Sequence, residues 1–229
     1  MGNLSEFLME ELNVATAFTI PIFGGIEVAE STVISWVIMA IIVILTLVLT
    51  RNMRVEKPGK LQVGVEYAVT ALQNLVRGII GHEGERYVPY LSTVLVFLGI
   101  SNIFAIFGMK PPTKDLNVTA ALALMSIILV QAASIRQNKV GGWLKGFTKP
   151  SKVITPLNVM ELAIRPLSLC MRLFGNVMGA FVVMKLLEHL VPVILPAVFS
   201  LYFDFFDGLL QAYVFVFLTG LYIKEAIEE

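Results

Sequence analysis

The chain has 229 residues, of which 57% are hydrophobic and 15% are charged, and its mean hydropathy is +0.81. This composition is too apolar for a soluble globular domain and places the chain in a membrane. The 17 basic and 17 acidic residues cancel, so the charge gives no indication of a nucleic-acid partner.

The N-terminal segment is acidic. Residues 1–30 contain five glutamates and no lysine or arginine, so they lack the basic start of a secretory signal peptide. A turn at Gly24 and Gly25 interrupts any long helix there. We therefore expect residues 1–30 to form an uncleaved extracytoplasmic arm and residues 31–229 to form a single membrane domain.

The rest of the chain alternates long apolar stretches with polar breaks. Because a bilayer core requires about 20 apolar residues per helix, the sequence predicts membrane spans at about 32–50, 90–109, 116–135, 154–190 and 197–227. Prolines separate the second from the third and the fourth from the fifth. The last two exceed the length of a span, so we expect a strongly tilted hairpin.

An amphipathic pattern at about 55–81 predicts one further helix, lying on the membrane surface. Basic residues gather directly after the first span and again in the loop 136–152, and such residues are retained in the cytoplasm. We therefore expect an external N-terminus and a cytoplasmic C-terminus. The predicted fold class is all-α, a polytopic membrane protein with about five membrane helices plus the surface helix.

A polar stripe interrupts the fourth apolar stretch. Glu161, Arg165, Ser168, Arg172 and Asn176 are spaced by four, three, four and four residues, which puts them on one helix face. A charge at the bilayer centre costs about 3 kcal/mol on insertion scales, so it normally faces protein or trapped water. The stripe therefore predicts a functional interface.

The last apolar stretch carries a matching set of polar residues, namely Asp204, Asp207, Gln211 and Tyr222, with Gly208 among them. Two such helices packed side by side would enclose polar groups. On the fourth stretch, Gly175 and Gly179 form a small-xxx-small pair that lets a neighbouring helix approach closely.

Several of these residues have a purely structural interpretation. Glu161 and Arg165, one turn apart, suit an intrahelical salt bridge as well as an ion-handling role. Asp204 and Asp207 suit the aqueous interface as well as an ion pathway. Arg172 is too deep in an apolar stretch to reach water easily, which leaves a structural pairing as the weaker interpretation.

The run from Arg165 to Asn176, Arg-Pro-Leu-Ser-Leu-Cys-Met-Arg-Leu-Phe-Gly-Asn, resembles the signature of subunit a of bacterial F-type ATP synthases. Supporting matches lie at 115–119, 156–161 and 210–222, and the resemblance covers about residues 28–229 in order. By position, Arg172 matches the essential arginine of that family, Gln211 its partner glutamine and Asn176 the signature asparagine. Glu161 matches an acid that precedes the motif.

Three positions depart from the family pattern. Phe181 and Asp204 stand where many bacterial members have a glutamate and a histidine, so that proton-pathway pair does not transfer. Cys170 replaces another small residue, a change that we expect to be tolerated. As a lone cysteine it is best interpreted as a small buried apolar residue.

The resemblance implies an ion-translocating stator that forms inlet and outlet half-channels against a rotating c-ring and couples H⁺ or Na⁺ flow to ATP synthesis. It implies the c-ring, peripheral-stalk b subunits and the lipid bilayer as partners, in the bacterial plasma membrane. The expected ion-translocation residues are Arg172, Gln211, Asn176, Glu161, Asp204 and Asp207. The expected c-ring contacts are Arg172, Ser168, Gly175, Gly179 and Gln211.

No phosphate-binding loop, catalytic triad or metal motif occurs in the sequence. We therefore expect no catalysis by this chain alone, no nucleotide binding and no cofactor or metal. The main alternative is a self-contained secondary transporter that uses Arg172 to bind an anionic solute, although the repeated halves of such proteins are missing from the sequence. A structural assembly protein ranks last.

Overall fold

The computed structural model describes most of the membrane domain and two short parts of the N-terminal arm. The described residues are 16–20, 26–51, 53–54, 58–104, 111–146, 155–190 and 199–228. All structural statements below concern these residues. The Gly24–Gly25 turn and the Pro192 and Pro196 break lie outside them.

Helices dominate the described chain. In order, its elements are β1 (Thr16–Ile20), β2 (Ile26–Ala29), α2 (Glu30–Thr50), α3 (Lys60–Ile80), η1 (Glu85–Tyr87), α4 (Val88–Ile103), η3 (Pro112–Lys114), α5 (Leu116–Gly146), α6 (Thr155–Leu190), η5 (Leu201–Asp207) and α8 (Gly208–Glu228). The strands pair antiparallel within the arm, with Thr19 opposite Glu27. Sequence patterns did not predict this strand pair.

The ends of the helices are set by local proline and glycine residues rather than by the limits of the apolar stretches. The surface helix α3 begins at Lys60 rather than near residue 55, because Pro58 and Gly59 precede it and disfavour a continued helix. It ends at Gly81, whose positive φ of 78° and N–H bond to the Arg77 carbonyl terminate the last turn. α5 continues past the predicted span to Gly146, with a break at Lys139, whose φ is 58°.

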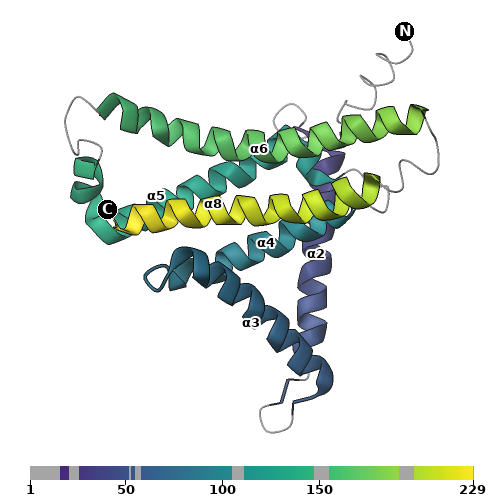
Figure 1. Cartoon of the computed structure of the whole chain (residues 1–229), viewed down its shortest axis with the longest axis horizontal. Helices are drawn as coiled ribbons and strands as arrows, with labels where there is room; N and C mark the ends of the chain where they lie inside the picture. Colours follow the sequence, from purple (N-terminus) through teal and green to yellow (C-terminus); the bar gives the residue numbers. More distant parts are fainter. Residues whose placement is uncertain are drawn as a thin grey trace.

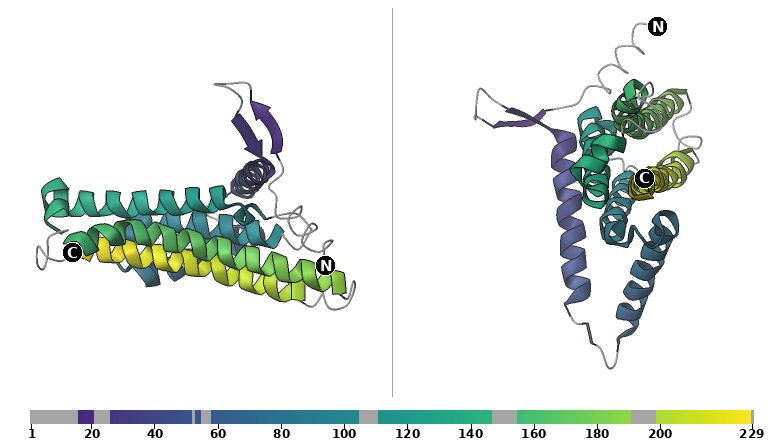
Figure 2. Two further views of the ribbon diagram at one scale, coloured as in Figure 1. Left: turned by 90° about the horizontal axis from the view of Figure 1, so that it is seen from above. Right: turned by 90° about the vertical axis from the view of Figure 1, so that its left-hand side faces the viewer.

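The long helices do not share one direction. α4, α5, α6 and α8 run alongside one another in Figure 1, whereas α2 runs across them, and both views of Figure 2 agree. The 36 residues of α6 extend about 54 Å, nearly twice the roughly 30 Å of a hydrocarbon core. If α2 crosses the membrane upright, the other four must tilt steeply.

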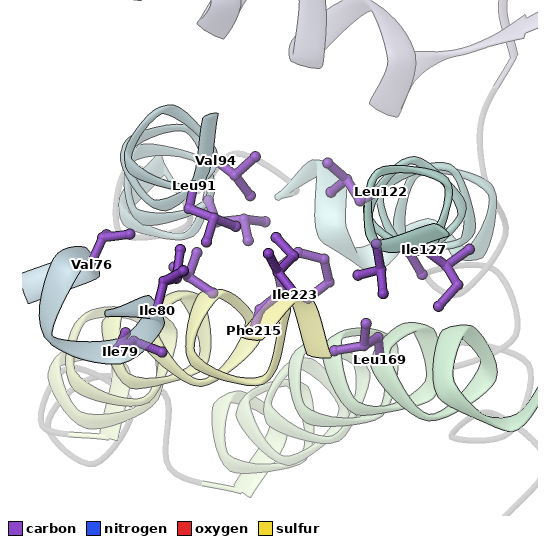
Figure 3. Close-up of a cluster of buried hydrophobic side chains, with 14 of the residues drawn as sticks. Val76, Ile79, Ile80, Leu91, Val94, Leu122, Ile127, Leu169, Phe215 and Ile223 are labelled. Carbon is purple, nitrogen blue, oxygen red and sulfur yellow. The ribbon is translucent and has the colours of Figure 1, made fainter. Parts of the chain in front are cut away.

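The apolar core lies where α3, α4, α5, α6 and α8 meet (Figure 3). Phe215 and Ile223 of α8 are at most 1% exposed and lie at its centre, with Leu91 of α4 on one side and Leu169 of α6 on another. α3 approaches α8 closely because Gly220 has no side chain: an added Cβ would lie 2.8 Å from Ile79 Cγ2.

Four described segments are long and apolar enough to cross a membrane, namely Glu30–Thr50, Leu116–Lys139, Thr155–Leu187 and Leu201–Glu228. The second predicted span, at about 90–109, corresponds to α4 as far as Ile103, and residues 105–109 of its expected range lie outside the described chain. The predicted fold class, an all-α multi-pass membrane protein, is confirmed.

Candidate functional site

The polar stripe lies along the middle of α6. All five of its residues fall within the helix, which continues through Pro166. On the core side of the same turns, Leu169, Cys170 and Leu173 are buried. The stripe therefore follows the edge of α6 that adjoins its buried side.

Arg172 is exposed at this edge. Within the described part of the chain, no side chain forms a hydrogen bond or ion pair with its guanidinium. Its neighbours on the open side include Leu167 and Met171, which are 60% and 52% exposed. The arginine thus projects from an apolar surface, and no described residue of this chain neutralises it.

Gly175 and Gly179 continue this open surface. Both are exposed, and a Cβ added to either would meet nothing within 4 Å. Their small size therefore serves no packing among the described residues. They leave room for a helix that approaches from outside the chain.

Asn176 and Gln211 join α6 to α8. The Asn176 amide Nδ2 donates to Gln211 Oε1 at 2.6 Å, and Gln211 is only 2% exposed. The two helices thus bring polar groups together, as the matching stripes predicted. The Gln211 Nε2 group is buried and has no hydrogen-bond acceptor among the described residues.

Arg165 forms a second polar junction between the same two helices. Its Nη2 lies 2.9 Å from Glu161 Oε1 on α6 and 3.0 Å from Glu225 Oε1 on α8. Its guanidinium carbon also lies 4.9 Å from the centre of the Tyr222 ring. The structure thus contains the intrahelical pair that spacing allowed. Glu225, from the charged end of the chain, is a partner that sequence patterns missed.

The two aspartates of the last apolar stretch lie in a different conformation from the rest of it. Residues 201–207 form a π-helix, and π-helical turns occur frequently at functional sites. Asp207 is half-buried, whereas only the backbone is described for Asp204. The element ends at Gly208, where an added Cβ would lie 2.8 Å from Asn102 Cβ. The Asn102 side chain of α4 therefore approaches this glycine closely.

Three consecutive polar residues between α4 and α5, Thr113, Lys114 and Asp115, are all buried. We call them the polar turn. Thr113 Oγ1 donates to Asn102 Oδ1 at 3.0 Å, and the amide of Asn102 in turn donates to the Gly208 carbonyl at 2.8 Å. This chain of bonds links the polar turn to α4 and α8.

The other two residues of the polar turn reach α6 and α2. The Lys114 ammonium lies 3.4 Å from the centre of the Phe181 ring on α6. Asp115 accepts a hydrogen bond from Ser31 of α2 at 2.5 Å and caps α5 through the Asn117 N–H at 2.9 Å. Phe181 therefore contacts a cation. Sequence patterns gave no signal for these contacts.

The charged and hydrogen-bonding groups lie along the α6–α8 helix pair. Among the described residues, no group of three His, Cys, Asp or Glu side chains could hold a metal ion. What the arrangement offers is one exposed cation at an open helix surface, flanked by polar junctions and carboxylates.

Comparisons with known proteins agree with this picture. The family model described as "ATP synthase A chain" matches residues 32–224. "ATP synthase subunit a" of Moorella thermoacetica is 37% identical over 205 residues, which are 89% of this chain and 93% of that protein. "ATP synthase subunit a 1" of Hahella chejuensis is 33% identical over 90% of this chain and 87% of that protein. "ATP synthase subunit a, sodium ion specific" of Propionigenium modestum is 31% identical over 89% and 75%.

Proposed function

Because the chain belongs to the ATP synthase A chain family, the subunit a of F-type ATP synthases, we propose that it forms inlet and outlet half-channels against the rotating c-ring. In this role it couples H⁺ or Na⁺ flow to ATP synthesis and catalyses no reaction by itself. Membership in the family makes it a component of the membrane sector. The single observation that carries the finer proposal is the exposed and unpaired Arg172.

The ring lies against the open surface of α6. This surface combines exposed apolar side chains with Gly175 and Gly179, around which nothing occupies the space of a side chain. A ring of helices could therefore approach the α6 backbone closely there. Ser168 and Arg172 lie on the same edge, with Gln211 behind them on α8.

Arg172 attracts ring carboxylates and blocks leakage. Arginine stays protonated under biological conditions, so it attracts an unloaded carboxylate but does not relay a proton. It also repels a free cation, which keeps ions from passing directly between the half-channels. Since no described residue neutralises Arg172, its charge remains available to the ring. The membrane potential drives the ion flow, and each elementary charge that crosses gains about 2.3 kcal/mol per 100 mV.

Polar groups on either side of Arg172 line the half-channels. One half-channel lies toward η5 and is lined by Asn176, Gln211, Asp207 and Asp204. The other lies at the opposite end of α6 and is lined by Glu161. The unpartnered Nε2 of Gln211 supports an aqueous path, because a buried amide donor needs an acceptor, which water in a polar channel supplies.

The placement in the membrane follows from the basic loops. We propose a bacterial plasma membrane, an N-terminal arm outside and a cytoplasmic C-terminus, since positively charged segments stay inside. The Arg165 end of the α6–α8 pair then faces the cytoplasm, and the η5 end faces outward. Peripheral-stalk b subunits hold the chain as a stator while the ring turns.

Replacing Arg172 by alanine tests the proposal in the assembled synthase. In inverted membrane vesicles we expect ATP-driven ion uptake to fall at least about tenfold, the equivalent of ~1.4 kcal/mol. The measurement is uptake of H⁺ or Na⁺ per assembled complex. Arg77→Ala is the matched control, because this arginine of α3 forms an exposed ion pair with Glu85 of η1.

Retained uptake in Arg172→Ala would refute the role given to this residue. The same vesicles separate the two coupling ions, since uptake is followed with each ion in turn. Purified chain alone in liposomes addresses the transporter alternative: accumulation of an anionic solute without partner subunits would favour that alternative over a stator.

A further inference from the structure

Two polar junctions hold α6 against α8, and Arg172 lies between them. At one junction, Arg165 bonds Glu225 at 3.0 Å and stacks near the Tyr222 ring. At the other, Asn176 donates to Gln211 at 2.6 Å. The two contacts involve residues 11 positions apart on α6, so both fall on nearly the same face of the helix.

Arg172 follows Arg165 by seven residues and precedes Asn176 by four. At 1.5 Å per residue these separations are about 10 Å and 6 Å along the helix axis. The three side chains thus stand nearly one above another. The outer two are joined to α8, whereas the middle one has no partner among the described residues.

Contacts with α5 and with the polar turn hold the other side of α6, and a single junction would fix its contact with α8 at one point only. The apolar contacts of Leu169 and Leu173 resist separation of the helices, but they are non-directional and permit small rotations and slides. Two separated polar contacts fix both the rotation and the height of the helix. A rotation of α6 by one residue, about 100°, would turn Arg172 away from its exposed edge.

We propose that Arg165, acting through Glu225 and Tyr222 of α8, is a positioning residue that holds Arg172 at a fixed place opposite the ring. This inference rests on the proposed function, because it requires a moving partner at Arg172. Each passing ring carboxylate pulls on Arg172, so the reaction force acts on α6. The Arg165 junction resists that pull at the end of α6 away from Asn176.

The chemistry of arginine suits this task. A guanidinium carries five donors in a planar fork and can bond two carboxylates while its face lies near an aromatic ring. Arg165 does so with Glu161, Glu225 and Tyr222. The Arg165 side chain is only 17% exposed, whereas the Glu225 side chain that it bonds is 48% exposed, so the guanidinium lies at the inner end of a half-exposed junction.

The test alters Glu225 and leaves Arg172 in place. In the complete synthase, Glu225→Gln removes the ionic bond between the helices but preserves the size of the side chain. We expect the number of ions taken up per ATP hydrolysed to fall about threefold, because a neutral amide holds the Arg165 guanidinium less firmly than a carboxylate does. Glu225→Asp keeps the charge and should retain at least about half of the wild-type ratio.

Glu228→Gln is the matched control. It removes the same charge from the same end of α8, but Glu228 pairs with Lys224 on its own helix at 3.7 Å. We expect its ratio to equal that of the wild type. If Arg165 and Glu225 only stabilised the chain, Glu225→Gln would lower the amount of assembled complex and leave the ratio in the remaining complex unchanged. That outcome overturns the inference.

Arg172→Ala is measured in parallel. If it abolishes uptake while Glu225→Gln behaves like the wild type, the positioning role fails and the proposed function stands. If Arg172→Ala retains uptake, the proposed function itself fails. Should Glu225→Gln assemble poorly, Arg165→Lys tests the same prediction, because it keeps the charge and loses the planar fork, and a wild-type ratio there also counts against the inference.

Discussion

The polar turn and the Arg172 edge of α6 differ in how their polar groups are buried and bonded. In the polar turn, Thr113, Lys114 and Asp115 are at most 8% exposed, and the described contacts join them to α2, α4, α6 and α8. At the edge of α6, Arg172 is exposed and pairs with no described residue.

This difference separates the residues that stabilise the fold from the residue that we propose acts in ion translocation. A buried polar group is costly unless it is bonded, so the polar turn stabilises the bundle only because its contacts are made within the chain. A charge left unpaired at a membrane-facing surface is unfavourable for the isolated chain. Under the proposed function, a ring carboxylate supplies the counter-charge that Arg172 lacks among the described residues. Residue type alone would not distinguish these two regions.

Asp115→Ala should have the largest effect on the architecture side of the comparison. The change removes the cap of α5 and the bond to Ser31 of α2. We expect the free energy of unfolding to fall by about 2.5 to 4 kcal/mol, because a cap contributes ~1 kcal/mol and a bond to a charged acceptor about 1.5–3 kcal/mol. Thermal unfolding of the detergent-solubilised complex measures it.

Ser31→Ala is the control for this change, since it removes the bond between helices and leaves the cap intact. Its effect should be smaller than that of Asp115→Ala. If the two variants unfolded at the wild-type temperature, the polar turn would not be the architectural element that its contacts suggest.

Helical periodicity was enough to predict much of the candidate site. Residues four or seven apart on a helix share a face whatever the tertiary fold, so the stripe containing Arg172 and its pairing with the stripe of α8 followed from spacing. The Asn176–Gln211 bond and the Glu161–Arg165 pair realise that pattern.

Contacts between elements distant in sequence were not predictable in this way. Glu225 lies 60 residues from Arg165 and belongs to a charged chain end that suggests a solvated tail. Asp115 meets Ser31 across 84 residues. The π-helix at 201–207 and the common direction of α4, α5, α6 and α8 depend on packing, which hydropathy does not encode. The sequence therefore predicted the helices, their polar faces and the pairing of α6 with α8, but not the contacts of Arg165 with Glu225 or of Asp115 with Ser31.

Gly175→Leu should have a smaller effect, and on function alone. The leucine occupies space that a ring helix needs, since the distance between packed helices depends on the side chains at the contact. We expect ATP-driven ion uptake to fall about tenfold, the equivalent of ~1.4 kcal/mol. Stability should not fall, because nothing lies within 4 Å of the added Cβ and leucine favours a helix over glycine.

Gly64→Leu provides the comparison for this change. Gly64 lies on α3, is exposed, and likewise has nothing within 4 Å of an added Cβ. Its uptake should match the wild type. Equal losses in both variants would mean that any bulky substitution disturbs the complex, and the open surface of α6 would have no special status.

Cys170→Ser should have the smallest effect, although Cys170 is only two residues from Arg172. Its side chain points to the opposite, buried side of α6, where Sγ lies 3.6 Å from Thr119 Oγ1 of α5. A serine hydroxyl can bond the same threonine, so we expect a stability change below about 1 kcal/mol and ion uptake within about twofold of wild type. A severe loss of uptake at unchanged stability would contradict the division of α6 into a structural and a functional side. If Cys170→Ser leaves ion uptake nearly unchanged while Gly175→Leu lowers it about tenfold, the buried structural side and the exposed functional side of α6 lie within about one turn of each other.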